Sequence, residues 1–89
     1  MTNQPVTKIR AGSITAAIWE NEIRTNGQTR RVLKATVERR YRDAEGTWKS
    51  TDSFGRNEIP LAIHCLYQAF QTILDMESGA ANEREQSRL

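Results

Sequence analysis

The sequence predicts an α+β domain: a curved antiparallel sheet of three to four strands, followed by one C-terminal helix and assembled as a dimer. Three observations support this prediction. Apolar and polar side chains alternate over residues 6–54, which is the period of a β-strand. Turn signals at Asn26-Gly27 and at residues 43–46 interrupt that alternation. Over residues 60–76 the spacing changes to that of a helix.

The chain has 89 residues, which suits one small domain. We expect a flexible N-terminus over residues 1–5, a folded domain over 6–77 and a disordered C-terminal tail over 78–89. Domains of this size often need a disulfide, a metal or a second subunit for stability. Cys65 and His64 are the only residues of their kinds, so the sequence predicts no disulfide, no metal and no cofactor. We expect Cys65 to be a small buried side chain, and we expect stability to come from oligomerisation.

The first strand is predicted over residues 6–19. Ile14, Ala16 and Ile18 share its apolar face, and Trp19 lies on the opposite, mixed face. Gly12 interrupts this run, since a glycine within a strand pattern marks a bulge, a bend or a short turn. The segment before Gly12 therefore forms either a separate strand or one arm of a bent strand, and we favour the bent strand.

Asn26-Gly27 predicts a tight hairpin turn, because both residue types tolerate positive φ. The returning strand is predicted over residues 29–42. One of its faces carries Leu33, Ala35 and Val37, and the other carries Lys34, Thr36, Glu38 and Arg40. Arg39 and Tyr41 continue the apolar face, and we expect them at the rim of the sheet.

A third strand is predicted over residues 47–54, after a turn in which Gly46 suits the left-handed position. The alternation places Trp48 and Phe54 on one face of this strand and Lys49 on the other.

The helix is predicted over residues 60–76, with Asn57 as its N-cap and Pro60 in its first turn. It carries more apolar residues than one small sheet can cover, and an exposed apolar stripe marks an interface. We therefore expect two helices to pack about a twofold axis. The predicted dimer interface consists of Ala62, Leu66, Ala69, Phe70 and Ile73.

Charge is distributed unevenly along the chain. Residues 1–56 contain 11 of the 13 Lys and Arg but 6 of the 11 Asp and Glu, a net charge of +5. Cations beside aromatic rings suit a single-stranded nucleic acid, because cations attract phosphates and ring faces stack on unpaired bases. The candidate nucleic-acid-binding residues are Lys8, Arg10, Trp19, Arg30, Lys34, Arg39, Arg40, Tyr41, Arg42, Trp48, Lys49 and Arg56.

Each of these signals has a plainer alternative. The cations could pair with acidic neighbours on a solvated strand face, and Trp19 or Trp48 could close the core at a strand end instead of stacking on a base. Residues 52–57 contain the elements of a phosphate cradle, but equally those of an ordinary capped helix start, and the latter is favoured.

The sequence offers little support for catalysis. The single histidine has no recognisable partner motif, and the carboxylates are scattered, so we expect no enzyme activity. The N-terminus is polar, and no apolar run approaches the ~18 residues that a membrane span needs. We expect a cytoplasmic protein that does not bind membranes.

The segments 8–19, 30–42 and 47–54, with the helix 60–76, resemble the family of the eukaryotic transcriptional coactivator called positive cofactor four and its bacterial and phage relatives. In that family a curved antiparallel sheet grips single-stranded DNA or RNA, and helices of two subunits form the dimer. The family's four strands require a split at Gly12. The resemblance implies that Lys8, Arg10, Arg30, Lys34, Arg40 and Lys49 hold phosphates while Trp19, Tyr41 and Trp48 stack.

The segments 8–14, 18–21 and 48–54 resemble more closely those of small uncharacterised prokaryotic and phage proteins, a likeness that carries no activity with it. The function we predict is non-catalytic binding of single-stranded DNA or RNA, with low sequence specificity, by a homodimer. The alternative is a small dimeric protein-interaction module, of the kind that mobile elements encode. A third option is duplex DNA binding through a strand ribbon in the major groove.

Overall fold

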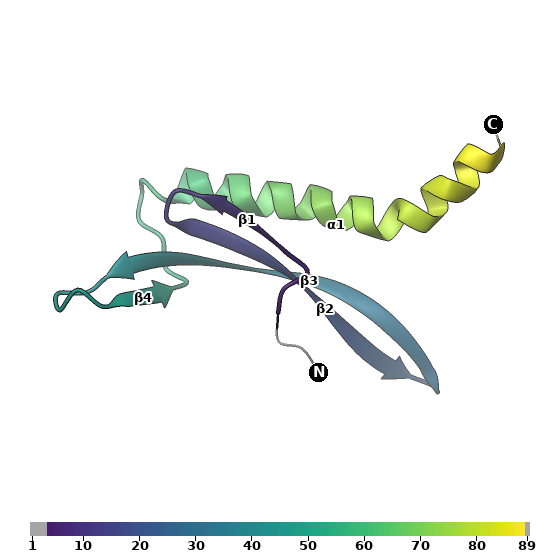
Figure 1. Ribbon diagram of the computed structural model, residues 1–89, viewed down its shortest axis with the longest axis horizontal. Helices are drawn as coiled ribbons and strands as arrows, with labels where there is room; N and C mark the ends of the chain where they lie inside the picture. The colour runs from purple at the N-terminus through teal and green to yellow at the C-terminus, as the bar shows by residue number, and fades with distance from the viewer. Residues whose placement is uncertain (1–3, 89) are drawn as a thin grey trace.

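The computed structural model describes residues 4–88, with side chains described as far as residue 79. Four antiparallel strands form a single open sheet in the order β1-β2-β3-β4, and one helix, α1, follows them in the chain. The helix lies along one face of the sheet, whereas the far end of the β2–β3 hairpin projects away from it (Figure 1). The predicted α+β class and the antiparallel sheet are confirmed.

Gly12 separates two strands, β1 (Thr7–Ala11) and β2 (Ile14–Thr25). The expected bent strand is therefore wrong. Gly12 has a φ of 59°, in the left-handed region that glycine adopts without strain. This lets the chain reverse within two residues, so that Ala11 pairs directly with Ile14.

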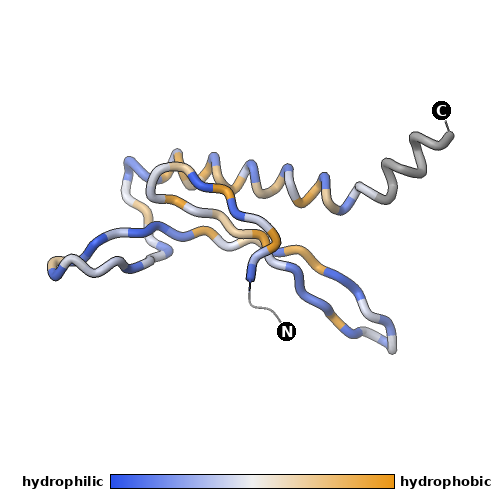
Figure 2. Tube along the Cα trace, in the orientation of Figure 1, coloured by the Kyte–Doolittle hydropathy of each residue, from blue (hydrophilic) through white to orange (hydrophobic). Residues whose placement is uncertain are grey.

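Asn26 and Gly27 form the predicted turn, with φ values of 53° and 77°. Thr25 pairs with Gln28 across it, and β3 (Gln28–Arg42) returns alongside the whole of β2. Positive φ at both central residues is typical of a type I′ turn, whose backbone twist matches the right-handed twist of the strands. The result is a hairpin about twice as long as an average strand pair, and its outer end is mostly hydrophilic (Figure 2).

The last strand, β4 (Trp48–Thr51), is shorter than the predicted 47–54. Asp43 organises the turn before it, because its Oδ1 accepts hydrogen bonds of 2.9 Å from the amides of both Glu45 and Thr47. The Thr47 amide is the main reason that the pKa of Asp43 is lowered. Since the strand ends at Thr51, Phe54 turns back to pack against the core, and the prediction that it shares a face with Trp48 is wrong.

The helix α1 (Ile59–Arg88) begins as predicted but is capped differently. No Asn57 hydrogen bond caps the helix within the described residues; instead Glu58 Oε1 accepts a 2.9 Å hydrogen bond from the preceding Gly55 amide, the backward contact of a capping box. The helix extends beyond its predicted end near Met76. The disordered tail expected over residues 78–89 stays a prediction, because the side chains beyond residue 79 lie outside the described part. The flexible N-terminus expected over residues 1–5 also stays a prediction, because residues 1–3 lie outside it.

The core is small and lies between α1 and the first half of β2. Ile14, Ala16 and Ile18 project from the strand against a helix stripe formed by Ala62, Cys65 and Ala69. Cys65 is fully buried, as predicted, and burial raises the pKa of its thiol. The residues that complete the core are partly buried: Ile9, Ala11, Leu33, Val37, Phe54 and Ile73.

Small side chains bring the helix close to the sheet, and this corrects the predicted dimer interface. Ala62 and Ala69 are buried in the monomer and Ile73 packs beside them, so these three residues belong to the core. Leu66 and Phe70 remain exposed.

Within the described residues, no helix combines the length and the apolar character needed to cross a membrane.

Candidate nucleic-acid interface

Within the described residues, the side of the sheet away from α1 has no layer packed on it, and we call it the open face. Strand registers define its members, because they alternate with the core residues. Lys8 pairs with Ala17 and Arg10 with Thr15 between β1 and β2, and Trp19 pairs with Lys34 across β3. The charged and aromatic members are Lys8, Arg10, Trp19, Arg30, Lys34, Glu38, Arg40, Arg42 and Trp48.

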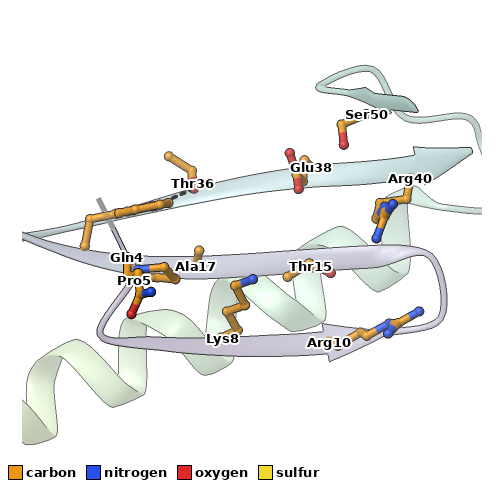
Figure 3. A pocket seen from close by; sticks show the side chains of 11 residues that line it. Gln4, Pro5, Lys8, Arg10, Thr15, Ala17, Thr36, Glu38, Arg40 and Ser50 are labelled. Atoms are coloured by element: carbon orange, nitrogen blue, oxygen red, sulfur yellow. Dashed lines mark hydrogen bonds between the residues drawn. The ribbon is translucent and has the colours of Figure 1, made fainter. Parts of the chain in front are cut away.

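A groove of about 580 Å³ runs over this face (Figure 3). Lys8 and Arg10 line it from β1, and Glu38 and Arg40 line it from β3. A second hollow of about 310 Å³ continues toward Trp48 and shares Arg10 and Arg40 with the first. The groove is lined by Gln4, Pro5, Lys8, Arg10, Thr15, Ala17, Trp19, Thr36, Glu38, Arg40 and Ser50.

The strands bring six cations to the open face but only one carboxylate, that of Glu38. None of the six forms an ion pair within the described part of the chain, where the salt bridges are Arg31–Glu20 and Lys49–Asp43. Pairing with acidic neighbours, the alternative considered above, therefore occurs for Arg31 and Lys49 on the helix side of the sheet but not for the six cations of the open face. Their charges stay available to an anionic ligand.

Trp19 is fixed on the open face by a hydrogen bond. Its Nε1 donates to Thr36 Oγ1 at 2.9 Å, from β2 to β3. The residue is half-buried and lies on the side opposite the core, so it does not close the core. An indole held in this way loses little conformational entropy when a base stacks on it.

Trp48 has a different setting. The residue is 55% exposed, and the guanidinium carbons of Arg40 and Arg42 lie 5.5 and 5.3 Å from the centroid of its ring. These are cation–π distances, so the ring orients both arginines at the end of the groove. Trp48 does not close the core either.

Four predicted site residues lie elsewhere. Arg39, Tyr41 and Lys49 alternate with the open-face residues and therefore lie on the helix side of the sheet. Arg39 donates to the Ser53 carbonyl at 3.1 Å and lies 5.4 Å from the Tyr41 ring, while Lys49 pairs with Asp43 at 3.3 Å. These contacts hold the end of the sheet. Arg56 lies in the turn before α1, away from the groove.

The candidate list omits residues that line the groove. Thr15, Thr36, Glu38 and Ser50 all line it, and each has the parity of a listed residue on its own strand: Thr15 that of Trp19, Thr36 and Glu38 that of Lys34, and Ser50 that of Trp48. That parity was the available signal, but a list selected for positive charge and rings could not include them.

The contacts at the helix start favour an ordinary capped start over a phosphate cradle. The Gly55 amide that such a site would use already binds the Glu58 carboxylate, which also places a negative charge there. The ordinary capped start is what the structure has.

Among the described residues, no three His, Cys, Asp or Glu side chains gather as metal ligands would.

One more surface is notable. Large apolar side chains of α1 remain exposed along one stripe at spacings of three and four residues, with Ile63 62% and Phe70 54% exposed. We call this stripe the exposed helix face. Its members are Ile59, Ile63, Leu66, Tyr67, Phe70 and Leu74.

No protein-family model, no curated protein and no solved structure matches the chain.

Proposed function

We propose that this protein binds single-stranded DNA or RNA on the open face of its sheet, without catalysing a reaction, and that it acts as a homodimer. The observation that carries the proposal is the set of six open-face cations without an ion pair, three of which (Lys8, Arg10 and Arg40) line the groove with Trp19, and the single carboxylate among them. Backbone phosphates would lie along the cations, and unpaired bases would stack on the indole.

The wide sheet surface favours a single strand over a duplex. A duplex hides its bases from a ring that lies on a sheet, whereas a single strand can turn its bases toward Trp19. The projecting end of the β2–β3 hairpin is the part that a ribbon-in-groove mode would use. It carries Glu20 and Glu22 beside its arginines, and Glu20 already pairs with Arg31, which weakens its attraction for phosphate.

The exposed helix face supports the dimer. From Ile59 to Leu74 the helix contains no Asp, Glu, Lys or Arg, so a second copy can pack on the same stripe without like charges meeting. The large side chains point out while Ala62, Cys65 and Ala69 point to the sheet. A monomer thus leaves most of its large helical side chains in water, and pairing would bury them.

Titration of fluorescently labelled oligonucleotides tests the proposal. Single-stranded DNA and RNA and a duplex of the same length are compared at two salt concentrations. We expect the single strands to bind more tightly than the duplex, with a log–log salt slope of about −0.7 per phosphate neutralised. Tighter duplex binding would support the ribbon mode instead. Absence of binding at low salt would reject nucleic-acid binding and favour the protein-interaction module.

A further inference from the structure

The open face contains one acidic side chain, and it is unpartnered. Glu38 projects from β3 between Thr36 and Arg40 and lines the groove (Figure 3). Within the described residues its carboxylate forms neither a salt bridge nor a hydrogen bond, although Arg40 is two positions away. A carboxylate that served only to neutralise this arginine would be expected to pair with it.

The position of Glu38 relative to the arginines would orient a bound nucleotide. Thr15 lies between Arg10 and Glu38 in one row across the sheet, so the two charged residues stand two strands apart, roughly 10 Å. A phosphate is repelled by Glu38 and attracted to Arg10 and Arg40. A nucleotide lying across these strands would therefore turn its phosphate toward the arginines and its base toward the carboxylate.

The chemistry of the carboxylate selects among bases. An ionised carboxylate only accepts hydrogen bonds, and its two oxygens match two adjacent donors. Guanine presents N1–H and N2–H side by side on its Watson–Crick edge, which is free in a single strand. Cytosine and adenine present one amine next to an acceptor nitrogen, and thymine presents one N–H between two carbonyls.

We infer that Glu38 is a specificity-determining residue that gives the groove a preference for guanine at one position of a bound single strand. The inference rests on the proposed function and refines it, because the contacts proposed above for the cations and for Trp19 are to phosphates and to a ring face and do not distinguish bases.

The test uses labelled oligothymidine of about 12 nucleotides, a length within the range of known single-strand sites. Matched versions carry one central guanine, inosine or cytosine. For the wild-type protein we expect guanine to tighten binding about tenfold relative to thymine, the scale of one bidentate pair. Inosine lacks the N2 amine and should lose most of this gain, and cytosine should give little.

Two charge-matched variants complete the experiment. Glu38→Gln should abolish the guanine preference, since an amide offers one acceptor and one donor, and should tighten binding to plain oligothymidine by removing a charge that repels phosphate. Glu22→Gln makes the same charge change on the opposite face of the hairpin and should keep the preference. Equal binding of the guanine and thymine versions by wild type, or a preference that survives Glu38→Gln, would overturn the inference while single-strand binding stands. Absence of binding to every oligonucleotide would overturn the proposed function as well.

Discussion

The indole Nε1 of Trp19 donates a 2.9 Å hydrogen bond to Thr36 Oγ1, which joins β2 to β3 on the open face. Lys34 lies directly opposite Trp19, so a ring and an unpaired cation stand side by side in the same row. This pair is the smallest unit that could hold one stacked base and one phosphate.

Removing the ring should weaken binding more than removing its hydrogen bond. Trp19→Ala should cost about 1–3 kcal/mol of single-strand affinity, the usual value of one stacked base. Thr36→Val should cost less, because it frees the indole but leaves it in place. Fluorescence anisotropy measures both, with Trp19→Phe as the control that restores most of the affinity. Full affinity in Trp19→Ala would show that bases stack elsewhere.

Trp48 should act through its arginines. Trp48→Ala should weaken binding of a single strand but leave the salt slope nearly unchanged, because Arg40 and Arg42 keep their charges and lose only their fixed position. Arg40→Ala should instead reduce the slope by about 0.7, the contribution of one phosphate contact. The slopes of the two variants, measured over the same salt series, separate these roles. Identical changes in slope would refute the positioning role of Trp48.

The exposed helix face should hold the dimer together. Phe70→Glu should produce a monomer with reduced stability, because Phe70 is 54% exposed in the monomer but would place an unpaired carboxylate in a twofold interface. Sedimentation gives the mass and circular dichroism the fold. Gln68→Glu adds the same charge on the exposed, polar side of the helix and should leave the dimer intact. Wild-type protein that sediments as a folded monomer at micromolar concentration would contradict the dimer.

Gly12 and Gly79 should respond in opposite ways to the same substitution. Gly12→Ala forces a side chain into a φ of 59° and toward Leu61 Cδ1 at 3.4 Å, and should destabilise the fold by roughly 1–2 kcal/mol. Gly79 lies within α1 with no atom near its added Cβ, so Gly79→Ala should stabilise the helix by up to about 1 kcal/mol. Urea unfolding of both variants measures the difference. Equal stabilities would mean that the tight turn at Gly12 is not required.

Much of the sheet could be predicted because strand alternation and turn chemistry are local. Asn26-Gly27 fixed both the turn and the pairing of β2 with β3, and thereby the face of each cation. Gly12 was ambiguous, since a glycine serves a bend and a turn equally well. The core residues change from odd positions at Ile9 and Ala11 to even positions at Ile14, and this change of parity indicates a two-residue reversal.

The helix shows what the sequence does not determine. Its apolar stripe is wide enough to face either a sheet or a partner, and the apolar spacing alone does not indicate which side meets the sheet. Packing decides this, because Ala62, Cys65 and Ala69 allow the helix to approach β2 closely while the larger residues cannot. The groove lining was only partly predictable, because Glu38 and Thr36 become neighbours of Lys8 only when β1, β2 and β3 lie side by side.

The most direct test of the account is a charge-matched comparison of the two faces of the sheet. One double variant, Lys8→Ala with Arg40→Ala, removes two open-face cations. The other, Arg24→Ala with Lys49→Ala, removes two cations from the opposite face. Binding of a labelled single strand is measured over a salt series after circular dichroism confirms both folds. We predict that the open-face variant loses affinity and about 1.4 of the salt slope, at about 0.7 per phosphate contact, while the other retains both. Equal losses in the two variants would show that binding follows net charge alone and would contradict a site on the open face.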